Sequence, residues 1–175
     1  MSVKGPLGGA WNVRGVVGAT RDSAVAKISA DTIDADFTAM VDGDVGRIDS
    51  KHHISGDITA NIIDKLSANE NATDLTVTLL QPVIPGDDRT EALGRYDVKG
   101  TSTNVRIRSA GHIGSFKTSI LIDSTVYAGV VGGAMGLLTS ANQFIADALI
   151  DKVDVKGDRD SAFAYVGSNF GAMRI

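Results

Sequence analysis

Apolar and polar residues alternate over several short stretches of this chain, and glycine or Asp-Ser pairs separate the stretches. Residues 75–79 (Leu-Thr-Val-Thr-Leu) are the clearest example. Alternation with period two is typical of a β-strand with one buried face. A larger block recurs at residues 93–100 (Leu-Gly-Arg-Tyr-Asp-Val-Lys-Gly) and 150–157 (Ile-Asp-Lys-Val-Asp-Val-Lys-Gly). In each case the next similar block begins 20 residues later, at Ile113 and Phe170. A fixed period in this range indicates stacked structural repeats.

Each block opens with an apolar residue, which we call the anchor. Val45 and Ile63 are further anchors, 18 residues apart. Two segments lengthen the spacing and are interpreted as loop insertions, residues 81–92 with two prolines and residues 131–149. Ser140 is a possible N-cap for a short helix in the second insertion, and an extended loop is the alternative. The apolar residues on one side of that helix would be Phe144, Ile145, Ala148 and Leu149.

A second half of the repeat begins with Asp-Ser, a pair that favours turns because both side chains bond nearby backbone groups. It occurs as Asp22-Ser-Ala-Val25, Asp123-Ser-Thr-Val126 and Asp160-Ser-Ala-Phe163. Residues 2–5 match residues 97–100, and residues 9–15 resemble a further copy with Leu7 as its anchor. Both ends of the sequence therefore fall inside a repeat. We expect either a piece of a longer solenoid or ends that stack on one another.

These patterns predict one all-β domain over residues 1–175, a parallel β-solenoid with coils of about 20 residues. Each strand would pair in parallel with its equivalent one coil away, and the anchors would form a core column. The glycine that follows several anchors fits a corner or a close approach of two backbones. An antiparallel β-sandwich is the second choice, because it would not require the same block at the same spacing.

Composition narrows the function classes. The formal net charge is −4, which argues against a nucleic-acid-binding protein. The chain has no cysteine, and aromatic residues make up only 5% of it, which fits a thin coil with little room for rings. No signal peptide is visible at the start. The most apolar run, residues 128–138, is too short to span a membrane.

The combination of the 93–100 block, residues 113–116 (Ile-Gly-Ser-Phe), residues 123–130 and residues 153–157 resembles the repeats of large secreted or surface-attached bacterial β-solenoid proteins. The resemblance implies a structural or adhesive role, an extracellular or cell-surface location and no catalytic residues. The absence of a signal peptide leaves a cytoplasmic location as the alternative. A weaker likeness is to bactofilins, cytoskeletal solenoids that polymerise end to end.

Several clusters are candidate metal sites, and each has a simpler interpretation. Pairs of aspartates suit a hard cation such as Ca²⁺, but turn formation explains them without one. They are Asp42 with Asp44, Asp87 with Asp88, and Asp158 with Asp160. The histidines lack a third ligand at a suitable spacing. They are His52, His53 and His112.

Two further clusters could bind or act on a sugar polymer. Arg106 and Arg108 share one strand face and could contact an anionic glycan, although a solvated face is the simpler interpretation. The 81–92 loop is the best candidate for polysaccharide cleavage, but one loop makes a poor cleft. Its charged residues are Asp87, Asp88, Arg89 and Glu91. No serine-nucleophile elbow or phosphate-binding loop is present.

We therefore expect a structural or scaffolding solenoid segment of a bacterial surface or secreted protein, self-associating end to end or joined to neighbouring repeats. No catalytic, cofactor-binding or metal-binding residue is assigned, and no cofactor is expected. A carbohydrate-binding or polysaccharide-cleaving β-helix is the alternative, and a bactofilin-like polymer is the second alternative.

Overall fold

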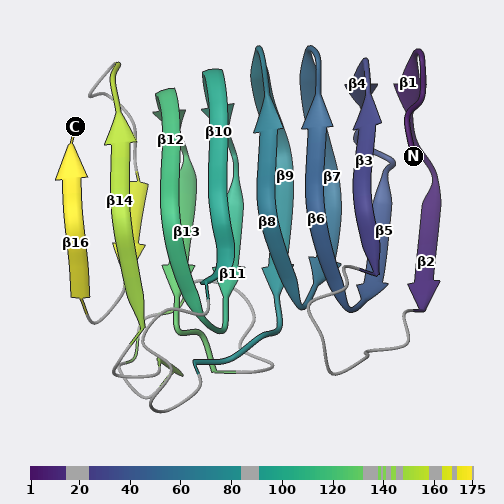
Figure 1. Ribbon diagram of the computed structural model, residues 1–175. Coiled ribbons are helices and arrows are strands. Elements are labelled where there is room, and N and C mark those ends of the chain that lie inside the picture. The colour runs from purple at the N-terminus through teal and green to yellow at the C-terminus, as the bar shows by residue number, and fades with distance from the viewer. Residues whose placement is uncertain are drawn as a thin grey trace.

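The computed structural model is a parallel β-solenoid, as the repeat pattern predicted (Figure 1). It describes residues 1–14, 24–83, 91–131, 138, 140, 143–144, 148–157, 163–166 and 169–174. For residues 163–166 and 169–174 only the backbone is described. Every ladder between its named strands is parallel, and these strands form a single 16-stranded sheet. The two chain termini lie at opposite ends of the row of coils. No α-helix occurs in this described part of the chain.

One long side of the solenoid, here called the anchor face, consists of the strands that begin with the anchors. Its strands are β3 (Val25–Ala30), β6 (Asp44–Ser50), β8 (Ile62–Ala68), the first part of β10 (Glu91–Thr103), the first part of β12 (His112–Ile122), β14 (Leu149–Val155) and β16 (Asn169–Arg174). They follow one another in this order along the solenoid, each paired with the strand of the next coil.

The chain then turns through a short row of strands and comes back along a second long side, the return face. The short row contains β1 (Pro6–Leu7), β4 (Thr32–Ile33) and parts of β7 (His53–Ala60), β9 (Asn71–Leu79), β10 and β12. The return face contains β2 (Ala10–Arg14), β5 (Thr38–Asp42), the later parts of β7 and β9, β11 (Arg106–Ser109), β13 (Ser124–Ala128) and β15 (Phe163–Val166).

The anchors form one continuous column through the solenoid, which confirms the central prediction. The register pairs each anchor with the anchor of the next coil. The paired anchors are, in order, Val45, Ile63, Leu93, Ile113, Ile150 and Phe170. The bridge between Ser2 and Ser29 likewise places residues 2–3 in the row of residues 97–98, as the sequence match predicted.

Three details of the predicted register are wrong. Val25 pairs with Val45 and belongs to the anchor column, although the Asp-Ser before it suggested the return face. Leu7 pairs with Ile33 in the short row and is therefore not an anchor. Phe163 pairs with Ser124, so the final return strand is displaced from the expected match with Val126. In each case a local motif resembled the repeat, but the observed pairing between neighbouring coils gives a different register.

Anchor strands do not alternate strictly, in contrast to return strands such as β5 and the later part of β9. In β6 two outward residues, Gly46 and Arg47, separate buried Val45 from buried Ile48. The glycine that often follows the anchor allows close packing between coils. A Cβ at Gly94 would lie 2.5 Å from the carbonyl oxygen of Asp64 in the preceding coil. This confirms the predicted close backbone approach at one such glycine.

The core accommodates aromatic rings better than the composition suggested. Tyr96, Phe116, Phe37 and Tyr127 are among the largest fully buried side chains. The rings of Tyr96 and Phe116 stack in adjacent coils, with centroids 4.5 Å apart and planes 5° from parallel. The Tyr96 hydroxyl forms a hydrogen bond of 2.8 Å with the Ser102 hydroxyl. Because successive coils place equivalent side chains one strand spacing apart, two flat rings at one position stack face to face.

The corner before the return face is built from a column of left-handed residues. Asp74, Asn104 and Asp123 have φ values of 50°, 52° and 45°. Their neighbours in β9, β11 and β13 are paired in register. Asp and Asn tolerate this conformation because their short side chains bond locally. The Asn104 side-chain amide donates to the Asp74 carboxylate at 2.5 Å. The Asp-Ser turn predicted at residue 123 is therefore confirmed as a corner.

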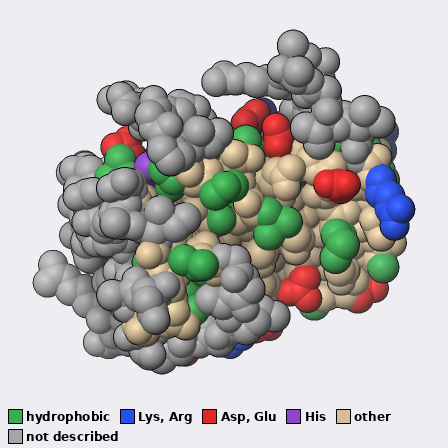
Figure 2. All heavy atoms as spheres, turned by 90° about the horizontal axis from the view of Figure 1, so that it is seen from below, with side chains coloured by type: hydrophobic (Ala, Val, Ile, Leu, Met, Phe, Trp, Pro, Cys, Tyr) green, Lys and Arg blue, Asp and Glu red, His purple; other side chains and the backbone are tan. Residues whose placement is uncertain are grey.

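Return strands end and anchor strands begin at one edge of the solenoid, the lower edge in Figure 1, and in chain order the predicted insertions fall between β9 and β10 and between β13 and β14. Figure 2 looks at this edge and shows separate hydrophobic side chains among polar and backbone atoms. Tyr127, Val130 and Leu138 form a small second cluster there, with Phe144 packed against it. Both insertions end earlier than predicted, because Glu91 belongs to β10 and Leu149 to β14.

The short helix predicted after Ser140 falls partly outside the described residues, because residues 141–142 and 145–147 are not described. Two of its expected members have other partners. Phe144 forms an antiparallel bridge with Val130, and Leu149 is a strand residue. Packing on the solenoid edge therefore takes precedence over the helical pattern at these two positions.

Candidate functional site

Basic side chains form a row along the outer side of the anchor face. The strand register pairs Lys27 with Arg47, Arg47 with Lys65, and Lys65 with Arg95. Each is the second residue after its anchor, where the anchor strand presents two residues outward in succession. We call these four residues the cationic row. At the equivalent position β12 has Ser115 in place of a basic residue, and β14 again has a basic residue, Lys152.

A groove of about 380 Å³ lies beside this row and crosses strands β3, β6, β8 and β10. Its described lining contains basic, acidic, amide and hydroxyl side chains and no aromatic ring. Its lining consists of Ser29, Arg47, Asp49, Ser50, Lys51, Lys65, Ser67, Asn69, Asp97 and Lys99. Because neighbouring strands belong to successive coils, the groove runs along the solenoid axis across four coils.

Asp49 organises one part of the groove. Its carboxylate forms an ion pair with the Arg47 Nε, lies 3.6 Å from the Lys27 Nζ and accepts a hydrogen bond of 2.5 Å from the Ser67 hydroxyl. Partial burial acts to raise the pKa of Asp49, but the hydrogen bonds from Arg47 and Ser67 and the charges of Arg47 and Lys27 outweigh it. The net result is a lowered pKa for Asp49. The hydrogen bond to Asp49 also raises the pKa of Arg47.

Two lysines of the groove differ from their basic neighbours. Among the described residues, neither Lys65 nor Lys99 has a carboxylate within 4.0 Å of its Nζ, whereas Arg95 lies 3.8 Å from Asp97. Lys65 is half-buried and Lys99 is exposed. Since unpaired cations in a groove attract anions, these two lysines are the side chains best placed to bind one.

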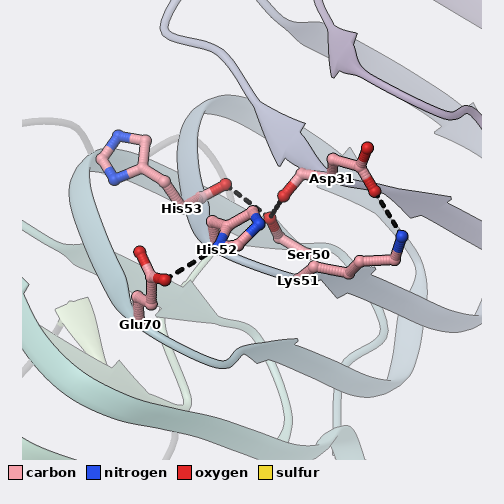
Figure 3. A network of polar contacts seen from close by, with 6 residues as sticks. All are labelled: Asp31, Ser50, Lys51, His52, His53 and Glu70. Atoms are coloured by element: carbon pink, nitrogen blue, oxygen red, sulfur yellow. Dashed lines mark hydrogen bonds and ion pairs between the residues drawn. The ribbon is translucent and has the colours of Figure 1, made fainter.

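A network of polar residues borders the groove at the corner after β6 (Figure 3). Lys51 forms an ion pair with Asp31 at 2.5 Å. The hydrogen bond from Lys51 is the largest influence on Asp31 and lowers its pKa, despite partial desolvation. The Ser50 hydroxyl bonds the carbonyl oxygens of Asp31, at 3.1 Å, and His53, at 2.6 Å. These bonds fix the corner that positions Lys51 at the groove.

The two adjacent histidines belong to this corner and point to different partners. His52 Nδ1 lies 2.7 Å from the Glu70 carboxylate, and His53 Nε2 lies 2.9 Å from the Ser55 hydroxyl. His112 is separate, and its Nδ1 accepts a hydrogen bond from the Leu149 backbone at 3.0 Å. Within the described ranges no group of three or more possible metal ligands occurs.

The remaining sequence candidates do not come together. Asp42 and Asp44 flank Gly43 at the turn between β5 and β6. Arg106 and Arg108 lie on the return face, in β11. Glu91 starts β10 on the anchor face. The other acidic candidates and Arg89 lie outside the described residues, namely Asp87, Asp88, Asp158 and Asp160.

The cationic row was not singled out from the sequence, although its signal was present. A basic residue occupies the second position after the anchor in the phrases Val45-Gly-Arg, Ile63-Asp-Lys and Leu93-Gly-Arg. Read one coil at a time, each looks like an ordinary solvated residue. Only the register between coils shows that they form a row.

Fold and surface together define a parallel β-solenoid with a charged groove along one long side. Comparison of the chain with protein-family models, with curated proteins and with solved structures found no match in any of the three. Among the described residues, no helix has the length and apolar character needed to cross a membrane.

Proposed function

We propose that this chain is a structural solenoid segment of a bacterial surface or secreted protein, and that its end coils associate with the end coils of other copies. The parallel β-solenoid supports a scaffolding role, because its stacked coils form an extended body with long regular faces. The surface or secreted location is supported by the resemblance of the repeat phrases to those of bacterial surface solenoids. No catalytic step is part of this proposal.

The observation that carries the proposal is the exposed sheet edge at the first coil. Within the described structure, β2 pairs with β5 alone and β1 pairs with β4 alone. The Thr38 N–H donates to the Gly9 carbonyl oxygen at 3.0 Å. Since backbone groups of a strand point alternately to its two sides, the N–H and C=O groups of Asn12 point away from β5. An additional parallel strand could pair with them.

Apolar side chains accompany this edge. Trp11 and Val13 are only partly buried and pack against the core, and the Trp11 ring meets the Phe37 ring edge-on with centroids 6.0 Å apart. At the other end of the row, the only named strand with which β16 pairs in the described structure is β14. Stacking of a first coil on a last coil would continue the parallel ladder and bury Trp11 and Val13. Such a head-to-tail contact does not close on itself, so it would produce filaments.

The test is an Asn12→Pro variant compared with Asn12→Ala, using light scattering after size exclusion and electron microscopy across a concentration series. Proline removes a donor that points away from β5, so β2 keeps its hydrogen bonds to β5 while strand addition is blocked. We expect the wild type and Asn12→Ala to form filaments one solenoid wide, and Asn12→Pro to remain as short rods. A wild type that stays monomeric, or a proline variant that assembles equally well, would overturn the proposal.

A further inference from the structure

We propose that the groove on the anchor face binds a linear acidic polysaccharide, with the sugar chain lying along the solenoid axis across β6, β8 and β10. This proposal concerns a different surface from the coil edges and does not depend on self-association. It also differs from the glycan contact considered at Arg106 and Arg108, because those residues lie on the return face.

The first support is the regular spacing of charge. Neighbouring strands of a sheet lie about 4.7–4.9 Å apart, so the cationic row presents one basic group per coil at that interval. One pyranose ring in an extended polymer has a similar length. A chain of uronic acids laid across the strands would therefore bring carboxylates within reach of Arg47, Lys65 and Arg95.

The second support is the state of the individual cations. Arg47 is held by Asp49, and Lys51 is held by Asp31. Lys65 and Lys99, by contrast, have no carboxylate within ion-pairing distance among the described residues. The paired residues give the groove a fixed shape, and the two unpaired lysines supply charge that a ligand carboxylate can neutralise.

The third support is the polar character of the rest of the lining, which distinguishes a polysaccharide from a nucleic acid. Ser29, Asn69 and Asp97 offer donors and acceptors to sugar hydroxyls. Among its described lining residues no aromatic side chain is present on which a base could stack, as single-stranded nucleic acids require.

The experiment measures binding of a defined oligogalacturonate to the full chain by isothermal titration calorimetry at physiological ionic strength, where exposed charges more than about 8 Å apart are largely screened. A neutral cello-oligosaccharide of equal length and a single-stranded oligonucleotide of similar charge serve as comparison ligands. The test variant is Lys65→Gln with Lys99→Gln. The matched control is Arg14→Gln with Arg106→Gln, which removes two positive charges from the return face. Circular dichroism confirms that each variant is folded.

We expect the wild type to bind the oligogalacturonate and to show no binding of the neutral oligosaccharide. The oligonucleotide should bind more weakly than the oligogalacturonate. The Lys65/Lys99 variant should bind the uronate about tenfold more weakly or worse, as expected when charged hydrogen bonds are lost. The return-face variant should bind within about twofold of the wild type, since overall charge alone has a modest effect in salt.

Any of three results would overturn the inference. They are a wild type that does not bind the uronate, an equal loss of affinity in the two double variants, and tighter binding of the oligonucleotide than of the sugar. Repeating the titration with Asn12→Pro separates this inference from the proposed function, because blocking the coil edge leaves the groove unchanged. Uronate binding by unassembled rods would support the groove even if self-association failed.

Discussion

The anchor face and the return face are made by the same coils but differ in how buried residues are spaced. Return strands such as β9 bury every second residue from Leu75 to Leu79. Anchor strands such as β8 bury Ile63 and Leu66 with two outward residues between them. The additional outward residue is the member of the cationic row. One irregularity, repeated in register in successive coils, thus gives a row of like side chains that strict alternation would not produce.

The largest expected effect concerns the stacked ring pair of the anchor face, Tyr96 and Phe116. Phe116→Ala should lower the free energy of unfolding by about 3–5 kcal/mol, because it opens a cavity beneath the stacked Tyr96 ring. A much smaller deletion on the return face, Ile107→Val, should cost only about 0.5–1.5 kcal/mol. Urea denaturation with a common slope measures both. Equal losses would show that removing the Phe116 ring leaves no larger cavity than removing one methyl group.

A smaller effect is expected from the glycine beside the anchor. Gly94→Ala places a methyl group 2.5 Å from the Asp64 carbonyl oxygen, which belongs to rigid backbone, so we expect a loss of about 1–3 kcal/mol. Gly114→Ala is the control, because its new methyl group would meet the end of the Glu91 side chain, which can rotate away. The midpoint temperature of thermal unfolding should be lower for Gly94→Ala than for Gly114→Ala. The reverse order would contradict the close-approach interpretation.

The smallest expected effect concerns Asp49 and Asp44, two carboxylates of β6 whose contributions to the free energy of unfolding should depend on pH in opposite ways. The pKa of Asp49 is lowered, so its stabilising contribution is present above the ordinary value of 3.8 and is lost as pH falls through the folded-state value. The pKa of Asp44 is raised by burial and by Asp64, so ionisation of Asp44 destabilises the fold as pH rises through its folded-state value.

At neutral pH, Asp49→Asn should therefore lower stability by about 0–1 kcal/mol, the range of exposed ion pairs, whereas Asp44→Asn should raise it slightly. Both differences should vanish in strong acid, where the native carboxyls are protonated in the folded and unfolded states. Unfolding curves across the pH range measure them. A loss of the same sign for both variants would refute the assigned pKa directions.

The sequence was sufficient for the fold and the anchor column, because buried residues repeat with a period that only stacked coils explain. The sequence placed Val25 on the wrong face, because the Asp-Ser pair before it matches the return-face motif. The low aromatic content also suggested less room for rings than Tyr96 and Phe116 have in the interior. The groove was missed because its lining comes from four different coils. Neighbours such as Lys65 and Arg95 are 30 residues apart in sequence and adjacent only through the register.

The single axis of stacking also determines how the protein would respond to a pulling force applied at its two ends. Each coil contributes only about 4.8 Å to the length of the body, yet a coil of 20 residues releases up to about 70 Å of chain when it peels away. The coil that begins at Ile113 has 37 residues before the next anchor and would release about 130 Å. Single-molecule stretching would therefore record the spacing of the anchors as a series of unequal steps.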